Sequence, residues 1–277
     1  MKIFINGKFY SKKAAKISIF DHGYLYGDGI YETMRSSNGI VFKVDEHIER
    51  LFHSAKMIYL DIPYSREEIK KTIYKTLKVN KLKNAYIRMS FSRGFGEIGL
   101  DPELCEKPTF AIIAKKFIPY PKEYYKNGVK IIVAKTKRNH PESISPEIKS
   151  TNFLNNILAK IEAKKQNAFE AIMLNLDGFV AEGTISNIFI VKKGILTTPS
   201  LKCGILDGIT RKYILENAKK LKIKVKETNL SINDLYTADE CFITNTSLGV
   251  MPVRFINDKS VKFNGDVINK LKRLKLG

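Results

Sequence analysis

The order of apolar and polar residues divides the first part of the chain into short strands and two helices. Residues 2–10 alternate in polarity around Asn6-Gly7, a dipeptide that favours a tight turn, and this pattern predicts a β-hairpin. Apolar residues then follow the 3.6-residue period of a helix after Asp45, which can cap it, and again in residues 66–78. Strands are predicted at residues 40–43, 85–92 and 109–114. Together these elements predict an α+β unit.

The pattern changes at residues 117–128, FIPYPKEYYKNG, which contain two prolines and end in Asn-Gly. Such a stretch is typical of a connection between domains. We therefore expect a small N-terminal domain at 1–117, a linker at 118–127 and a larger domain at 128–277. In the larger domain we expect strands at 129–134, 171–176, 179–181, 188–191, 195–198, near 225, at 241–244 and at 250–255. Helices are expected at 210–221 and around Asp234. A further helix is expected along the apolar positions Phe153, Leu154, Ile157, Leu158 and Ile161. The predicted fold class is thus α+β with two domains.

The formal net charge of +20 suggests anionic ligands or partners. The lysines are dispersed in pairs such as Lys70-Lys71 and Lys219-Lys220, so we expect no nucleic acid partner. Because no run approaches the roughly 20 apolar residues of a membrane span, and the N-terminus reads as a hairpin, we expect neither export nor insertion. The three cysteines are far apart and form no CxxC motif, which favours reduced thiols in the cytoplasm over disulfides or a zinc site.

Two charged residues lie where one predicted element gives way to another. Lys149 ends an irregular stretch just before a predicted helix, so its amine can be directed into a cleft; a solvated surface lysine is the alternative interpretation. Glu182 ends a predicted hairpin strand beside Gly183, where a carboxylate can meet the ring nitrogen of a ligand; a solvated glutamate is again the alternative.

Three further features could bind a phosphate group. Ile209 and Thr210 begin a predicted helix, and the free amides of a helix N-terminus bind anions, although ordinary capping by Asp207 or Thr210 explains the same residues. Thr244-Asn245-Thr246-Ser247 opens between two apolar strands and is either a polar turn or part of a phosphate site. Arg50, on the helix after Asp45, can pair with a phosphate bidentately.

A lysine amine, a carboxylate for a ring nitrogen and a phosphate site are together what pyridoxal 5'-phosphate (PLP) requires. The sequence resembles the class IV aminotransferases, the D-alanine and branched-chain group, over nearly the whole chain. The resemblance is carried, in order, by GYLYGDGIYETMR, EHIERL, EIKSTNFLNNILAKIEA, GFVAEGTISNIF, TPSLKCGILDGITR and LYTADECFITNTSLGVMPV.

The resemblance implies specific roles for these residues. Lys149 would form the Schiff base with PLP and act as general base, and Glu182 would hold the pyridinium. Arg50, Ile209, Thr210 and Thr246 would grip the phosphate. It also implies a PLP enzyme of fold type IV, with a small N-terminal α/β domain, a larger domain built on a pseudo-barrel sheet, and a homodimer whose active sites border the subunit interface.

The substrate is the least determined part of the resemblance. Tyr31 resembles the tyrosine that meets the substrate carboxylate in D-amino-acid transaminases, but residues 95–99 lack the Arg-x-His element of those enzymes. Tyr86-Ile87-Arg88 resembles a branched-chain motif, whereas Phe153 stands where branched-chain enzymes usually carry tyrosine. Thr33 and the TNTSLGVMPV loop resemble aminodeoxychorismate lyases. The candidate substrate contacts are Tyr31, Thr33, Arg35, Tyr86, Arg88 and Ser247.

The prediction is therefore a PLP-dependent transaminase acting on small amino acids and 2-oxo acids, with D-amino acids slightly favoured over branched-chain L-amino acids. The alternatives are a branched-chain aminotransferase, an aminodeoxychorismate lyase, and a basic binding protein without catalysis. Tyr31 and Thr33 could also share one face of a strand merely as packing residues.

Overall fold

The computed structural model describes residues 1–263 and 265–274, and these form two compact units. The first unit comprises Met1–Ile118 and the short segment Ile148–Phe153; the second comprises Pro119–Glu147 and the chain from Leu154 onward. The domain limits expected at residues 117 and 128 remain a prediction. The contact pattern adds Ile148–Phe153, and with it Lys149, to the first unit.

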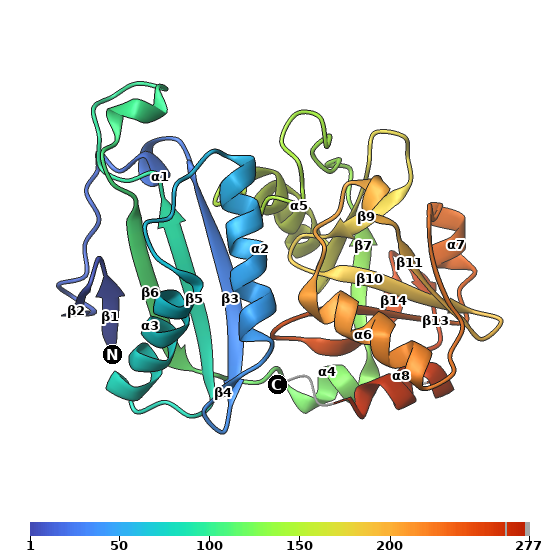
Figure 1. The fold of residues 1–277 in the computed structure, drawn as a ribbon. Helices are drawn as coiled ribbons and strands as arrows, with labels where there is room; N and C mark the ends of the chain where they lie inside the picture. The colour runs from blue at the N-terminus through green and yellow to red at the C-terminus, as the bar shows by residue number, and fades with distance from the viewer. Residues whose placement is uncertain (264, 275–277) are drawn as a thin grey trace. The chain divides into compact units, whose positions relative to one another are not determined.

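The first unit is built on a six-stranded antiparallel sheet with the strand order β2-β1-β6-β5-β3-β4 (Figure 1). Its strands are β1 (Lys2–Ile5), β2 (Lys8–Ser11), β3 (Gly29–Ser37), β4 (Ile40–Val41), β5 (Ala85–Ser92) and β6 (Thr109–Lys116). The predicted hairpin and the predicted strand 85–92 are confirmed. Its helices are α1 (His22–Leu25), α2 (Val44–Met57), α3 (Arg66–Val79) and the 3-10 turn η1 (Pro102–Leu104).

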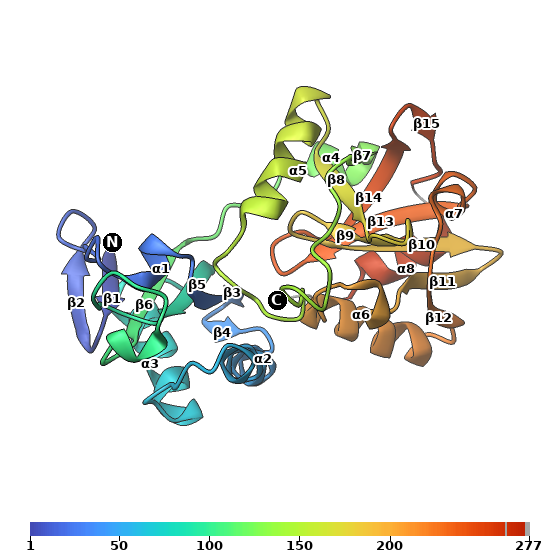
Figure 2. The same cartoon turned by 90° about the horizontal axis from the view of Figure 1, so that it is seen from above.

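Helices α2 and α3 lie on the same face of this sheet, as Figures 1 and 2 show. Their buried positions Ile48, Leu51, Ile69 and Ile73 repeat at helical spacing and pack against the inward residues of β3, β5 and β6. The two helices predicted from the apolar period are therefore confirmed. Since this face is closed by α2 and α3, the side chains that alternate with the core residues project from the opposite face of the sheet.

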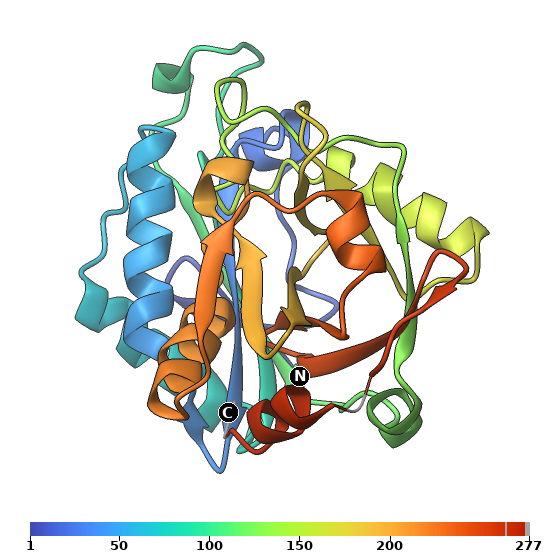
Figure 3. The same ribbon diagram turned by 90° about the vertical axis from the view of Figure 1, so that its right-hand side faces the viewer.

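The second unit is built on a curled sheet with the strand order β12-β11-β10-β13-β14-β7-β8-β9, in which β15 also pairs with β14 (Figure 3). Its strands are β7 (Val129–Val133), β8 (Glu170–Leu174), β9 (Val180–Gly183), β10 (Asn187–Lys192), β11 (Ile195–Pro199), β12 (Val225–Thr228), β13 (Glu240–Asn245), β14 (Gly249–Ile256) and β15 (Lys259–Ser260). Its helices are α4 (Lys122–Asn127), α5 (Leu154–Lys165), η2 (Leu201–Cys203), α6 (Ile209–Lys220), α7 (Ile232–Tyr236) and α8 (Asp266–Lys272).

Both faces of the curled sheet are covered, which explains its nearly continuous apolar strands. Ile188 and Ile243 belong to a core cluster on one face, whereas the neighbouring residues Phe189 and Phe242 pack on the other face with helices α6 and α8. The helix predicted at 210–221 is thus confirmed with its start at Ile209. Among the described residues, no helix is long and apolar enough to span a membrane.

Two details differ from the sequence-based expectation. The stretch predicted as a linker contains helix α4, which begins after Pro121 and ends at Asn127, with Gly128 at the C-cap at a φ of +71°. Helix α5 packs Ala159 and Ala163 against β8 and buries Asn156, whose amide donates to the Thr184 carbonyl, whereas its predicted apolar positions remain largely exposed. Those exposed positions are Leu154, Ile157, Leu158 and Ile161. The period identified the helix correctly, but small residues form its buried face because it lies close to the sheet.

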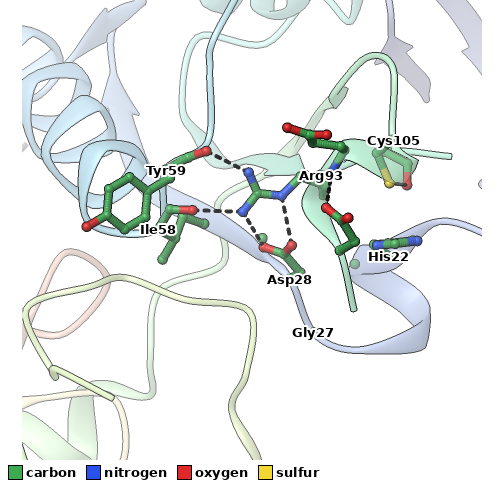
Figure 4. A network of polar contacts seen from close by, with 12 residues as sticks. His22, Gly27, Asp28, Ile58, Tyr59, Arg93 and Cys105 are labelled. Atoms are coloured by element: carbon green, nitrogen blue, oxygen red, sulfur yellow. Dashed lines mark hydrogen bonds and ion pairs between the residues drawn. The ribbon is translucent and has the colours of Figure 1, made fainter. Parts of the chain in front are cut away.

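Arg93 joins three parts of the first unit at the end of β5 (Figure 4). Its guanidinium donates from Nε and Nη2 to the two carboxylate oxygens of Asp28, at 2.8 and 3.2 Å. It also donates to the carbonyl oxygens of Ile58 and Tyr59, which follow the last turn of α2, at 2.8 and 2.7 Å. One side chain therefore ties the start of β3 and the end of β5 to the C-terminus of α2.

We expect Arg93→Met to lower the free energy of unfolding by roughly 3 kcal/mol, because it leaves Asp28 and two carbonyl groups without their donor. Arg66 is the matched control, since it pairs with Glu49 in a similar fork but is 57% exposed. Arg66→Met should cost less than about 1 kcal/mol. Urea denaturation monitored by circular dichroism measures the free energy of unfolding of both variants. Equal losses would show that the contacts of Arg93 stabilise the protein no more than an exposed ion pair does.

Candidate active site

Lys149 is held by backbone hydrogen bonds beside the first residues of β3. The Tyr31 amide donates to the Lys149 carbonyl at 2.9 Å, and the Thr151 amide donates to the Gly29 carbonyl at 2.8 Å. The Lys149 amide donates to the buried Ser54 hydroxyl of α2 at 3.1 Å. The backbone carbonyl and the backbone amide of Lys149 are therefore both held by hydrogen bonds. Lys149 is half-buried, and the interpretation as a solvated surface lysine does not describe it.

The amine of Lys149 faces an aromatic side chain. Its Nζ lies 4.7 Å from the ring centre of Tyr31, and the guanidinium carbon of Arg88 lies 3.9 Å from the same centre. Phe153 meets the Tyr31 ring edge-on at 5.7 Å. Burial raises the pKa of Tyr31 to about 12, although Arg88 opposes the shift. The phenol thus stays neutral and can serve as a hydrogen-bond donor at physiological pH.

The remaining substrate candidates of the first unit lie along the same face of the sheet. Thr33 pairs with Arg88 across β3 and β5, and Arg35 pairs with Tyr86. Each step of two residues along a strand is roughly 7 Å, so Arg35 and Tyr86 lie further from Lys149 than Thr33 and Arg88 do. The Arg35 guanidinium stacks on Phe117 at 4.1 Å. The structure therefore groups Tyr31, Thr33 and Arg88, with Arg35 and Tyr86 further along the strands.

Arg50 belongs to a buried charge network on the helix side of the sheet. Its Nε and Nη2 donate to the carboxylate of Glu32 at 2.7 and 2.8 Å, and His47 contacts the same carboxylate through Nδ1 at 2.7 Å. The fork expected to face a phosphate is therefore directed at Glu32. A phosphate contact from Arg50 must use another edge of the guanidinium.

The network shifts the pKa values of both Glu32 and His47. Burial alone would raise the pKa of Glu32, but the adjacent Arg50 and His47 outweigh it and hold this pKa far below its ordinary value. Burial lowers the pKa of His47, and the charges of Arg50 and Lys149 lower it further, while Glu32 opposes the shift. His47 is thus neutral and donates its Nδ1 hydrogen to Glu32.

Glu182, in β9 of the second unit, is buried, and its carboxylate accepts hydrogen bonds from three groups of the same unit. The donors are Nε of Arg138 at 3.0 Å, the Leu206 amide at 3.0 Å and Nδ2 of Asn187 at 3.3 Å. The side chains of Glu182 and Arg138 are only 7% and 9% exposed. A solvated strand-end glutamate is therefore excluded, and the carboxylate has a counterion inside the protein.

The N-terminus of α6 is linked to this carboxylate through Asn187. Nδ2 of Asn187 also donates to the Leu206 carbonyl at 3.0 Å, and its Oδ1 lies only 2.1 Å from the position that a Cβ atom on Gly208 would occupy. Gly208 is the N-cap of α6 and, among the described residues, makes no side-chain capping bond. The cap position is therefore held by glycine instead of Asp207 or Thr210, and Ile209 and Thr210 begin the helix as an anion site requires.

The loop between β13 and β14 carries Thr246 and Ser247, both half-buried. Oδ1 of Asn245 accepts from the amides of Ser247 and Leu248, each at 2.8 Å. Nδ2 of Asn245 donates to the Ile185 carbonyl at 3.0 Å. The loop is thus a turn organised by Asn245 and tied to the bend that follows β9.

Four polar residues of these networks were missed by the sequence reasoning. Glu32 lies between Tyr31 and Thr33, and strand alternation places it on the core face, where a charged residue needs a partner. Asn187 follows a Ser in an otherwise apolar strand, which is a weak signal. His47 lies on the predicted helix after Asp45 with no pattern that marks its role, and Arg138 carries no pattern that separates it from other basic loop residues.

Residues 29–256 match the model of the family described as amino-transferase class IV. A protein of Methanocaldococcus jannaschii, provisionally named a branched-chain-amino-acid aminotransferase, is 47% identical over 98% of this chain and 94% of its own length. The aminodeoxychorismate lyase of Bacillus subtilis is 39% identical over 92% of this chain and 87% of its own. The D-alanine aminotransferase of Bacillus licheniformis is 34% identical over 94% and 90%.

Solved structures agree with this similarity. The branched-chain amino acid aminotransferase of Escherichia coli superposes with a TM-score of 0.95 at 31% identity, covering 98% of this chain and 92% of that one. The branched-chain aminotransferase of Thermoproteus uzoniensis with norvaline gives a TM-score of 0.92 at 34% identity, covering 99% and 94%. The predicted two-part α+β architecture is therefore confirmed, and the preference for D-amino acids is not.

The buried network of Glu32, His47 and Arg50 predicts a loss of stability in acid. His47 has a folded pKa below its usual 6.5, and Glu32 has a folded pKa below its usual 4.5. The unfolded chain therefore takes up each proton at a higher pH than the folded chain, and the free energy of unfolding falls as the pH falls. The protonation of His47 should lower the free energy of unfolding below about pH 6.5, and that of Glu32 should lower it further below about pH 4.5.

His47→Gln keeps a donor for Glu32 but cannot titrate. Between pH 7 and 5.5 we expect wild type to lose roughly 1 kcal/mol that this variant retains, measured by urea denaturation at each pH. His53→Gln, an exposed position on the same helix, is the control and should follow wild type. Parallel curves for wild type and His47→Gln would mean that His47 does not change its protonation on folding.

Proposed function

The chain belongs to the class IV aminotransferases, whose cofactor is PLP, and we propose that it is a transaminase that exchanges the amino group of a small, apolar L-amino acid with a 2-oxo acid. The observation that carries the proposal is the presence of each group the reaction needs in a defined environment. Lys149 is fixed at its backbone beside Tyr31, and Glu182 is a buried, paired carboxylate.

The residues fit PLP at each of its polar ends. The start of α6 at Ile209 and Thr210, which Gly208 leaves without a side-chain cap among the described residues, suits the phosphate, together with Thr246. Glu182 suits the ring nitrogen, because its buried carboxylate is paired with Arg138 and can accept a further hydrogen bond from the ring N–H. Lys149 suits the aldehyde. Arg50 would reach the phosphate only with the edge of its guanidinium that Glu32 does not occupy.

When bound, PLP withdraws electrons from the Cα atom of an attached amino acid, so that its proton can leave. Lys149 would attach the cofactor covalently and, once displaced, carry that proton at Nζ. The Tyr31 ring centre lies 4.7 Å from Nζ and would hold the amine beside this ring. The Tyr31 phenol and the Arg88 guanidinium would bind the substrate carboxylate, with Thr33 and Ser247 as further hydrogen-bond partners.

The environment of Lys149 supports an apolar substrate side chain. Phe153 and Tyr31 meet edge-on and form an aromatic wall within the first unit. Such a wall suits the isopropyl and isobutyl groups of branched-chain amino acids. A D-amino acid is the second candidate because Tyr31 is placed to meet a carboxylate, and the lyase reaction is the third because Thr33 lies opposite Arg88.

We expect the protein purified with PLP to lose its visible absorbance on addition of L-leucine and to regain it with 2-oxoglutarate. D-Alanine in a parallel cuvette should give a response at least about tenfold slower. This ratio corresponds to an activation barrier that is roughly 1.4 kcal/mol higher for D-alanine. A faster response to D-alanine would reverse the preference. If neither amino acid reacts, aminodeoxychorismate is the next substrate to supply.

Borohydride reduction of the PLP-loaded protein, followed by peptide mapping, should place the label on Lys149. Lys149→Ala should abolish both the label and the response to amino acids, whereas Lys164→Ala, an exposed lysine on α5, should change neither. A label on any other lysine would refute the assignment of Lys149.

We further propose a homodimer whose interface includes an exposed apolar surface of the first unit. We define the loop patch as Ile19, Tyr24, Phe95, Ile98 and Leu100, with Ile98 and Leu100 at 71% and 85% exposure. The rings of Phe20 and Phe95 meet edge-on at 6.3 Å, and the Gly99 amide donates to the Tyr26 hydroxyl at 3.0 Å, so the two segments form one ordered surface. Ordered apolar surfaces of this kind mark protein contacts.

Sedimentation equilibrium should give twice the chain mass of 31.6 kDa for wild type. The double substitution Ile98→Glu and Leu100→Glu should shift the mass toward one chain, because two buried charges would face the partner. Ile40→Glu changes an equally exposed but isolated isoleucine and should leave the dimer intact. A monomeric wild type, or a dimeric double variant, would exclude the loop patch as the interface.

A further inference from the structure

Arg138 is a buried cation for which the proposed transaminase chemistry has not yet required a role. It lies in the irregular stretch after β7, and its amide donates to the Leu174 carbonyl at 2.8 Å. Its Nη1 donates to the side-chain oxygens of Asn155 and Asn156 at 3.3 and 3.4 Å. With Nε directed at Glu182 at 3.0 Å, the guanidinium is held between β9 and the start of α5.

The three donors to Glu182 described above are not equivalent. The Leu206 amide and the Asn187 amide group are neutral and satisfy the oxygen lone pairs, whereas Arg138 alone among them brings a positive charge. A buried carboxylate without a counterion tends to take up a proton, because desolvation penalises the charged form. Among these three donors, Arg138 therefore supplies the positive charge that favours the ionised carboxylate, and the neutral donors fix the orientation of the carboxylate.

We propose that Arg138 is a positioning residue that determines where the proton shared by Glu182 and the PLP ring nitrogen resides. The proposal rests on the assignment of Glu182 to that nitrogen. With Arg138 present, the carboxylate binds a proton weakly, so the proton stays on the nitrogen and the ring keeps its positive charge. Without Arg138, the proton moves from the nitrogen to a carboxylate oxygen, and both groups become neutral.

The consequence for the reaction follows from the charge of the ring. A protonated ring accepts the electron pair left at Cα, whereas a neutral ring does so poorly. Loss of Arg138 should therefore reduce turnover without removing any group that touches the substrate. Cofactor affinity should change little, because the phosphate site at α6 is separate from Arg138.

The test uses holoenzyme loaded with PLP that carries 15N at the ring nitrogen. Its 15N chemical shift reports directly whether that nitrogen is protonated. Wild type should give the protonated shift, and Arg138→Met, which keeps an unbranched apolar stem but removes the charge, should give the unprotonated shift. Its kcat should fall by about 10- to 100-fold, the range known for residues that support the ligands of metal ions, with KM changed much less.

Two further variants separate charge from packing. Asn187→Ala removes a neutral donor from the same carboxylate and should keep the protonated shift. Arg138→Lys restores the charge without the contacts of the guanidinium fork and should also keep it. If Arg138→Met fails to fold, Arg138→Gln replaces it, since glutamine keeps a hydrogen-bond donor but no charge.

The outcomes distinguish this inference from the function on which it rests. A protonated shift in a neutral variant at position 138 would overturn the inference and leave Arg138 a purely structural residue. An unprotonated nitrogen in wild type would overturn both the inference and the role of Glu182, although transamination could still be observed. Failure of wild type to bind PLP would refute the proposed function itself.

Discussion

The placement of Lys149 depends on a short antiparallel pairing between residues 149–151 and the start of β3. The chain leaves the second unit after Glu147, runs beside Gly29 and Tyr31, and rejoins the second unit at Leu154. Two backbone hydrogen bonds and the bond to Ser54 fix this crossing. Because these hydrogen bonds use backbone groups of Lys149, its side-chain amine is not needed to hold the crossing in place. The position of the Lys149 backbone is set by β3, the strand that carries Tyr31 and Thr33.

Buried and half-buried carboxylates in this basic chain repeatedly lie against an arginine. Glu32 is paired with Arg50, Asp28 with Arg93 and Glu182 with Arg138. Arginine suits such sites because its planar fork can match both carboxylate oxygens and remains charged when buried. The excess of positive charge counted from the composition is mostly lysine spread over the surface, whereas these three arginines act inside the fold.

Much of the fold could be predicted because strand alternation and helical period are local properties. The strand 85–92 and the helices around Leu51 and Ile73 follow directly from them. Helix α5 shows the limit, since the apolar positions found by the period are exposed, whereas two alanines that pack on the sheet and an asparagine are buried. How closely a helix approaches a sheet is a property of the packed structure.

Site residues that belong to a sequence motif could be predicted from the sequence. Site residues whose importance depends on an ion-pair partner elsewhere in the chain could not. Lys149, Glu182 and the start of α6 could be named from ordered motifs, and their roles in binding PLP remain proposals. Arg138 and Glu32 are recognised only once their partners are known, because an ion pair joins residues far apart in sequence. The direction of the Arg50 fork likewise depends on which acceptor lies nearest in the folded chain.

The close approach of Gly208 to Asn187 makes the residues allowed at position 208 depend on the residue at position 187. Any side chain at 208 would displace the asparagine that holds both Leu206 and Glu182. A change at the helix start would therefore be felt at a carboxylate 26 positions earlier in the chain. Substitutions at 208 and 187 should accumulate only as pairs, so a laboratory library that varies one position while holding the other constant will find few functional solutions.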